Sequence, residues 1–203
     1  MHRDVSMPRR PRIEIPGLTY HVTTHGIDGL ALFREPEDRD VAVSLLAEEV
    51  RLSGWICVEY VIMSTHYHVV LELTKSSLSS GFQRFNARYA QYYNGRYERR
   101  GHVFAGRFRD KMIETDAHRL EVVRYVARNP TKANMCRLPE HYPWSGYGAI
   151  IGFAPVDPVV DLRAALEPFG GSRSAYRRFV EETDPRVRRG QVRARPQVAT
   201  KRR

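Results

Sequence analysis

The densest apolar stretch of the chain, residues 55–73, constrains the fold more than any other feature. It reads WICVEYVIMSTHYHVVLEL, which is rich in β-branched and aromatic residues and has two small polar residues, Ser64 and Thr65, near its middle. β-branched and aromatic side chains favour strands, whereas small polar residues favour turns. The segment is long enough for two strands, so it predicts a β-hairpin in the core of the protein.

The segments on either side of this hairpin alternate between strand and helix periodicity. Apolar and polar residues alternate through residues 18–24, as in a half-buried strand, and residues 111–114 predict a short strand. Apolar residues recur at helical intervals within residues 36–53, 82–94 and 117–129, which predicts three amphipathic helices. The resulting order of elements predicts an α+β fold with a mostly antiparallel sheet flanked by helices.

Helix-end signals organise the second half of the chain. Asp116 is expected to cap the last core helix and Pro130 to stop it. Beyond it, residues 139–152 predict an aromatic loop interrupted by prolines, and residues 159–169 and 174–182 predict short helices. The chain then divides into four parts: a basic lead-in at 1–12, a core domain at 13–135, a C-terminal extension at 136–184 and a disordered basic tail at 185–203.

Charge is concentrated at the two ends of the chain. Among the 203 residues, 33 lysines and arginines stand against 23 aspartates and glutamates, a formal net charge of +10. Residues 185–203 contain eight basic residues and no acidic one, and residues 1–12 contain four arginines and one aspartate. Such ends hold too little apolar content to fold, and they suit nucleic acid or an anionic membrane. Without an amphipathic pattern or a lipidation signal, we favour nucleic acid.

Cysteine spacing and the absence of targeting signals limit the class of protein and the cell compartment that we expect. The two cysteines, Cys57 and Cys136, are far apart and outside any Cys-x-x-Cys spacing, which argues against a zinc knuckle or a disulfide scaffold. The N-terminus has no apolar signal-peptide core, and no apolar run approaches the length of about 18 residues that a membrane span needs. We expect a soluble, cytoplasmic protein without a membrane partner.

Two histidines in the second strand of the predicted hairpin, His66 and His68, are candidate metal ligands. Residues two apart on a strand project from the same face, so both imidazoles can converge on one ion. Tyr67, Val69 and Leu71 then take the opposite, buried face. By itself, such a pair is more often two polar residues that share the solvent side of a strand, so this alternative stays open.

A second candidate pair lies on the predicted helix at 117–129. Tyr125 and Asn129 are one helical turn apart, so a phenol and an amide face the same way. A tyrosine in an amphipathic helix is more often a core residue than a nucleophile, and an asparagine before a proline usually ends a helix. A functional interpretation is favoured because the histidine pair, the helical tyrosine and the neighbouring amide occur together in a chain with basic ends.

Several segments, taken together, resemble a known family. Residues 63–71, MSTHYHVVL, are similar to the His-hydrophobic-His metal strand of the single-tyrosine HUH transposases with an IS200-like domain. The REP-associated tyrosine transposases are more similar still, and the likeness runs in order over roughly residues 9–182. The similar segments are RIEIPGLTYHVT at 12–23, RYAQYYN at 88–94, GHVFAGRF at 101–108, RYVARNP at 124–130 and SAYRRFVEE at 174–182.

This resemblance implies a ferredoxin-like HUH core and a catalytic role for the domain at 13–135. It implies a DNA transposase that nicks and rejoins single-stranded DNA at or near REP-like hairpins, in a prokaryotic cytoplasm at the nucleoid. Tyr125 takes the position of the nucleophile that forms a 5′-phosphotyrosine. His66 and His68 take metal-ligand positions, and Asn129 stands where relatives carry a third, amide or carboxylate, ligand. The implied ion is Mg²⁺ or Mn²⁺, and two imidazoles suit Mn²⁺ better.

The chain departs from the family pattern at two places. Ser64-Thr65 stands where Pro-Asn commonly precedes the first histidine, and Ala127-Arg128 replaces a more usual His-Leu pair. Neither change removes a catalytic group, so both bear on local geometry rather than on activity.

A basic segment between the second and third predicted helices suits phosphate contacts. Two other functions stay open: a domesticated relative that binds or cleaves hairpins for its host, and a non-catalytic protein that only binds DNA or RNA hairpins. A pure binder has no need of His66, His68, Tyr125 and Asn129 together, which argues against the second. The hairpin sequence and the oligomeric state, monomer or homodimer, stay open. The residues predicted to contact nucleic acid are Arg99, Arg100, Arg107, Arg109 and Lys111.

Overall fold

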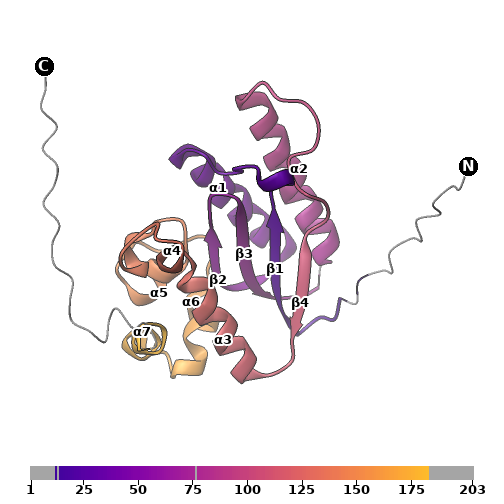
Figure 1. The fold of residues 1–203 in the computed structure, drawn as a ribbon. Helices are drawn as coiled ribbons and strands as arrows, with labels where there is room; N and C mark the ends of the chain where they lie inside the picture. The colour runs from indigo at the N-terminus through magenta and orange to yellow at the C-terminus, as the bar shows by residue number, and fades with distance from the viewer. Residues whose placement is uncertain (1–11, 13, 76, 183–203) are drawn as a thin grey trace, which may run out of the picture.

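The fold is built on a four-stranded antiparallel sheet. The computed structural model describes residue 12 and residues 14–75 and 77–182. The strands follow the order β2-β3-β1-β4 across the sheet (Figure 1). Two helices connect them in a β-α-β-β-α-β succession, the ferredoxin-like arrangement, so the predicted α+β class is confirmed. The core elements are β1 (Thr19–His25), α1 (Pro36–Ser53), β2 (Ile56–Ile62), β3 (His66–Glu72), α2 (Leu78–Arg96), β4 (Arg109–Ile113) and α3 (Asp116–Ala127).

The ends of α1 follow from local sequence. Pro36 occupies the first turn, where its missing N–H loses no helical hydrogen bond, and Glu35 and Asp38 form a reciprocal capping box. Gly54 ends the helix in the left-handed conformation, at φ 64°, which glycine adopts without steric cost. The turn at Ser64-Thr65 separates β2 from β3. The helix at 36–53 and the hairpin are thus confirmed.

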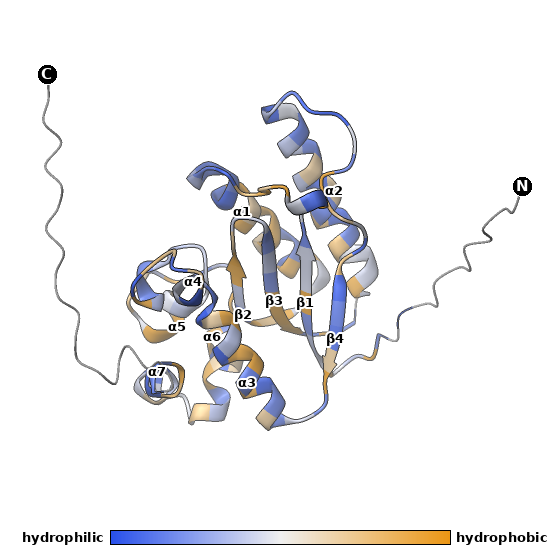
Figure 2. Cartoon of the chain, in the orientation of Figure 1, coloured by the Kyte–Doolittle hydropathy of each residue, from blue (hydrophilic) through white to orange (hydrophobic). Residues whose placement is uncertain are grey.

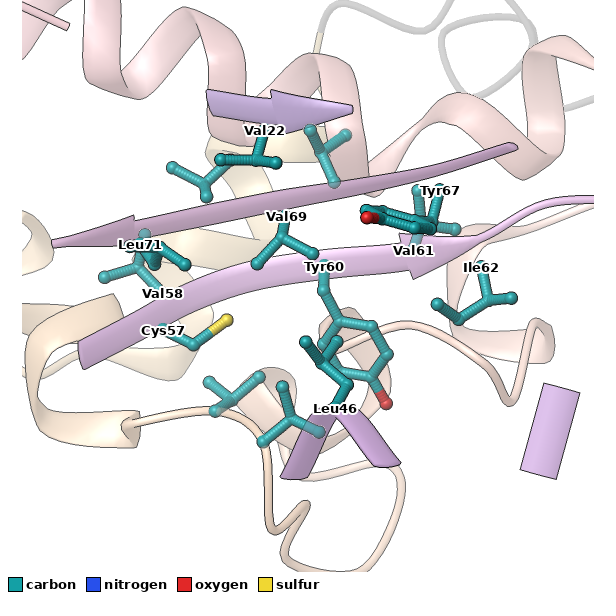
Figure 3. Packing of buried hydrophobic residues seen from close by; sticks show 14 of the residues in the cluster. Val22, Leu46, Cys57, Val58, Tyr60, Val61, Ile62, Tyr67, Val69 and Leu71 are labelled. Atoms are coloured by element: carbon teal, nitrogen blue, oxygen red, sulfur yellow. The ribbon is translucent and has the colours of Figure 1, made fainter. Parts of the chain in front are cut away.

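Alternation along β3 assigns one face of the sheet to each layer of helices. Tyr67 points toward α2, where its ring stacks on Phe82 at a centroid distance of 6.2 Å. Val69 and Leu71 belong to the same buried cluster, which Figure 3 shows from close by. His68 points to the opposite face, which α3 covers. The sheet therefore separates an apolar layer beneath α1 and α2 from a histidine-bearing face beneath α3.

The two edges of the sheet are protected in different ways. The C-terminal extension covers β2, since the backbone N–H of Ile62 donates to Trp144 and that of Asp161 donates to Cys57. In the described part of the chain, β4 has no strand on its outer side, and it carries charged residues at 109–111. Charges on an uncovered edge discourage pairing with another chain. Figure 2 shows this contrast between a hydrophobic β2 and a mostly hydrophilic β4.

The C-terminal extension is more helical than the sequence predicted. Residues 139–152, expected as a loop, contain the 3₁₀ helix η2 (Pro139–His141) and α5 (Tyr147–Ile151). A proline in the first turn suits the start of η2, and Gly152 ends α5 in the left-handed conformation at φ 79°. The helical segments expected near 159–169 and 174–182 are present as α6 (Leu162–Leu166) with η3 (Glu167–Phe169), and as α7 (Arg173–Glu181). Two further short elements are η1 (Ile27–Gly29) and α4 (Asn129–Lys132).

The last core helix, α3, differs from its prediction at both ends. Thr115, not Asp116, caps it, because the Thr115 side chain accepts a hydrogen bond from a backbone N–H of the first turn. The helix ends at Ala127 and does not continue to Asn129. Pro130 lies in the first turn of α4, a position that proline tolerates, so it begins the next helix instead of stopping the previous one.

Of the predicted lead-in at 1–12, only Arg12 is among the described residues, and the predicted tail at 185–203 lies outside them. The division between a domain at 13–135 and an extension at 136–184 stays a prediction. Tyr142 and Tyr176 of the extension belong to the same hydrophobic cluster as the sheet. Within the described ranges, none of the helices combines the length and the apolar character that crossing a bilayer requires.

A buried carboxyl group joins the extension to the sheet. Glu59 of β2 is fully buried, its Oε1 accepts a hydrogen bond of 2.9 Å from the backbone N–H of Tyr60, and the hydroxyl of Tyr176 lies 2.7 Å from Oε2. Burial raises the pKa of Glu59 to about 8, although these hydrogen bonds oppose the shift. Gly146 permits the close approach, because a Cβ there would lie 2.7 Å from Oε1. Glu59 is therefore mostly uncharged at neutral pH.

We expect the stability of the protein to report the titration of Glu59. The folded chain keeps this proton up to about pH 8, whereas an unfolded glutamate loses it near pH 4.3. The stabilisation is complete below the unfolded pKa, falls by roughly a few kcal/mol between the two pKa values, and is lost once the pH has risen through the folded one. Glu59→Gln keeps the shape without the titration. Urea unfolding between about pH 5 and pH 9 should show the wild type losing stability relative to the variant, and parallel curves would contradict this.

Candidate active site

Four histidines form a continuous row on the face of the sheet that α3 covers. The register of β1 against β3 pairs His25 with His66. It also pairs Thr23 with His68, which places His21 diagonally to His68. Opposed residues of paired strands share a face. Ring centroids lie 5.1 Å apart for His25 and His66, 5.0 Å for His66 and His68, and 5.0 Å for His68 and His21. These four residues are called the histidine row below.

Helix α3 brings Tyr125 against one end of the row. The tyrosine ring meets His68 edge-on at a centroid distance of 5.4 Å and His21 at 6.2 Å. Val123 and Val126 on the same helix are buried in the core, whereas Tyr125 stays 41% exposed. The helix thus anchors itself through its valines and presents the phenol beside the histidines. His68 and Tyr125, which the sequence singled out in separate motifs, are in contact.

The Nδ1 atoms of the two predicted ligands are both engaged by protein groups. Thr65 Oγ1 lies 3.1 Å from Nδ1 of His66, and Nε2 of His21 lies 2.9 Å from Nδ1 of His68. Within the described residues, Nε2 of His68 is buried and has no hydrogen-bond partner, and the same holds for Oγ1 of Thr23 on the opposing strand. Buried polar atoms are normally paired, so unpartnered ones here indicate that a further group completes the site.

Burial keeps these imidazoles uncharged. Burial, with a smaller contribution from neighbouring histidines, lowers the pKa of His66 to about 4 and that of His68 to about 3. Burial, with the positive charge of Lys111 nearby, lowers the pKa of His21 to about 4. All three are neutral at physiological pH, which is the form in which a ring nitrogen binds a metal.

The donor set at His66 and His68 fits a divalent ion. Each imidazole is neutral and uses Nδ1 for a protein contact, which leaves Nε2 for a metal bond. Across the ranges that the structure describes, no group of three or more histidine, cysteine, aspartate or glutamate side chains surrounds one point. A third protein ligand would therefore come from another residue type, such as an amide.

Asn129 lies at the start of α4, outside the helix that carries Tyr125. It keeps the predicted separation of one turn, since its Nδ2 donates a hydrogen bond of 3.4 Å to the carbonyl oxygen of Tyr125. This contact uses the amide nitrogen and leaves the amide oxygen for a ligand. The role of Asn129 as third metal ligand stays a prediction.

Part of the predicted basic segment reaches the histidine row. In β4, Lys111 pairs with His21, so the two side chains share a face. Arg107 and Arg109 line a pocket of about 230 Å³ together with His25. Arg109 and burial lower the pKa of His25, with burial the larger cause. Three of the five predicted cations therefore lie along the row.

Arg99 and Arg100 do not join this group. The guanidinium of Arg99 lies 5.8 Å from the ring centroid of Tyr93 in α2, and Arg100 is exposed in the loop that follows. Neither contacts the histidine row in the part of the chain that the structure describes. Their contact with DNA stays a prediction.

Two histidines of the row, His21 and His25, were not identified as site residues from the sequence. The available signal was their position: His21 and Thr23 share one face of the predicted strand at 18–24, and His25 continues the same alternation one residue beyond it. That signal does not reveal which strand lies alongside His68, because pairing register is a tertiary property.

A basic pocket beside Tyr125 was also not identified from the sequence. It encloses about 320 Å³, and Nζ of Lys132 lies 5.0 Å from the centroid of the tyrosine ring. Its residues recur at intervals of three or four, as on one face of a helix, and this signal was visible in the sequence. The lining residues are Glu121, Arg124, Tyr125, Arg128 and Lys132.

Comparison with known proteins gives a structural likeness. No protein-family model matches the chain, and no curated protein does. A REP-associated tyrosine transposase bound to a REP hairpin superposes with a TM-score of 0.60 at 17% identity, over 77% of this chain and 93% of that one. A candidate transposase from Deinococcus radiodurans R1 gives a TM-score of 0.38 at 14% identity, over 59% of this chain and 95% of that one. From the first likeness, this chain has the fold of a REP-associated tyrosine transposase.

Proposed function

We propose that this protein is a metal-dependent tyrosine transposase that cleaves and rejoins single-stranded DNA at or near hairpins. Tyr125 is the proposed nucleophile, which forms a 5′-phosphotyrosine and releases a 3′-hydroxyl. His66, His68 and Asn129 are the proposed ligands of Mg²⁺ or Mn²⁺. The observation that carries the proposal is the contact of an exposed Tyr125 with His68, whose buried Nε2 has no partner in the described chain.

The exposure of Tyr125 weighs against a purely structural tyrosine. Tyr67 and Tyr89 are 0% exposed and fill the core beneath α1 and α2, whereas Tyr125 is 41% exposed. A tyrosine that served packing alone would gain more by turning inward, since burial of an aromatic ring contributes about 1.5–3 kcal/mol. The phenol instead lies between the neutral histidines and the basic pocket, where an anionic substrate fits.

The charges around Tyr125 suit an attack on a phosphodiester. A divalent ion, when bound, offsets the charge of the non-bridging phosphate oxygens, which otherwise repel a phenolate. The chain itself adds Lys132 and Arg124 on one side of the phenol and Lys111 near His21 on the other. These cations hold the DNA backbone beside the nucleophile, and the neutral imidazoles leave the ion's charge unopposed. Positioning and charge stabilisation are the main contributions that phosphoryl transfer needs.

A DNA hairpin with single-stranded flanks is the proposed substrate. The solved transposase with this fold is bound to a REP hairpin. Support from this chain comes from the basic groups along β4 and α3, which lie on the same side of the sheet as the histidine row. Such contacts with the backbone fix the position of DNA without selecting its sequence.

The polarity of cleavage tests the proposal. A synthetic hairpin with single-stranded flanks, labelled at one end or the other, is incubated with the protein and Mn²⁺. We expect the protein to remain attached to the 5′ end of the downstream fragment, the upstream fragment to carry a free 3′-hydroxyl, and EDTA to abolish both products. Attachment to a 3′ end, or undiminished cleavage in EDTA, would overturn the assignment. Tight hairpin binding without cleavage would favour a non-catalytic binder.

A further inference from the structure

The two ends of the histidine row are built alike but bonded differently. His25 stacks on His66 with ring centroids 5.1 Å apart and planes at 20°, and His21 stacks on His68 at 5.0 Å and 25°. Only the second pair is joined by a ring-to-ring hydrogen bond in the described chain, at 2.9 Å between Nε2 of His21 and Nδ1 of His68. In the first pair, Nδ1 of His66 lies against the hydroxyl of Thr65 instead.

The hydrogen bond between His21 and His68 contains one proton, and its position sets the tautomer of His68. Between two neutral imidazoles, either ring nitrogen can be the donor. If Nε2 of His21 donates, His68 carries its proton on Nε2, a buried atom without any acceptor in the described chain. If Nδ1 of His68 donates, Nε2 holds an unused lone pair. Buried N–H groups without acceptors are rarer than unused acceptors, so the second arrangement is favoured.

We propose that His21 is a positioning residue that accepts the Nδ1 proton of His68 and thereby holds Nε2 of His68 as a free lone pair for a divalent ion. The inference rests on the proposed function, in which His68 binds that ion. Ligating histidines commonly donate their other ring N–H to a protein acceptor, which sets both the tautomer and the ring orientation. Here the acceptor is a second histidine from the neighbouring strand. His21 itself needs no bond to the ion.

Substitutions at position 21 distinguish this hydrogen-bonding role from simple packing beside Tyr125. Phenylalanine at position 21 keeps a stacking ring and removes the acceptor. Glutamine at position 21 supplies an oxygen acceptor on a side chain of similar reach. His25→Phe is the matched control, because it replaces the other stacked histidine of β1 without touching the bond to His68.

The test uses the full-length protein without metal, followed by titration with MnCl₂. Long-range ¹H–¹⁵N spectra of the histidine side chains near pH 7 report which nitrogen of His68 carries the proton. We expect Nδ1–H in the wild type and in His25→Phe, a shift toward Nε2–H in His21→Phe, and recovery in His21→Gln. Calorimetry with Mn²⁺ should show about 10- to 100-fold weaker binding for His21→Phe. Amide spectra check that each variant is folded.

The outcomes separate this inference from the proposed function. An Nε2–H proton on His68 in the wild type, or an unchanged tautomer and Mn²⁺ affinity in His21→Phe, overturns the role of His21 even if the protein cleaves DNA. If the tautomer of His68 changes with substitution of His21 as expected but the protein binds no Mn²⁺, the result supports the hydrogen-bonding role of His21 and contradicts the metal-dependent function.

Discussion

Substitution of Tyr125 by phenylalanine should abolish strand cleavage while the protein remains folded and keeps its affinity for hairpin DNA. The change removes one oxygen from a residue that is 41% exposed, so the core is not disturbed. Loss of a nucleophile leaves only the contributions of positioning and charge, and the rate should fall by on the order of 10⁴-fold or more. The measurement is the single-turnover rate of hairpin cleavage in Mn²⁺.

Mass spectrometry identifies the attached residue. Digestion of the trapped protein–DNA adduct should place the nucleotide on the peptide that contains Tyr125. Tyr92→Phe is the control, because its hydroxyl donates to Asp38 on the other side of the sheet and should leave cleavage unchanged. An adduct on another tyrosine, or persistent cleavage by Tyr125→Phe, would refute the assignment of the nucleophile.

The second large effect is expected from removal of both strand histidines. His66→Ala/His68→Ala takes away two of the proposed metal ligands, and a divalent ion contributes several kcal/mol to charge stabilisation in such reactions. Cleavage should therefore fall by on the order of 10³-fold or more, to the level seen in EDTA. Hairpin affinity should change little, because backbone contacts by arginine and lysine supply most of it.

Loss of cleavage in the double alanine variant could also come from unfolding, because His68 is 5% exposed and its truncation leaves a cavity. His66→Gln/His68→Gln keeps more of the volume and should lose cleavage to a similar degree. His141→Ala, in the C-terminal extension beside Phe153, is the control that removes a histidine away from the row. Wild-type cleavage by either double variant would show that these two histidines do not hold the catalytic ion.

Elements whose limits depend on nearby residues were predictable from sequence. The helix between Pro36 and Gly54 and the hairpin turn at Ser64-Thr65 follow from caps and turns, which act within a few residues. The common face of His66 and His68 follows from the period of a strand. Where local signals competed, prediction was weaker: Pro130 was expected to stop a helix, yet it lies in the first turn of α4 and is itself buried.

Local sequence patterns thus predict the succession of strands and helices and the residue types available for chemistry. Which of these residues meet depends on how the strands pair and how the helices pack. His21 lies against His68 because β1 pairs with β3 in one register, and Tyr125 reaches both because α3 packs its valines onto the sheet. Pairing register and helix packing minimise the free energy of the whole sheet, so they depend on residues far apart in the chain, and no local periodicity encodes them.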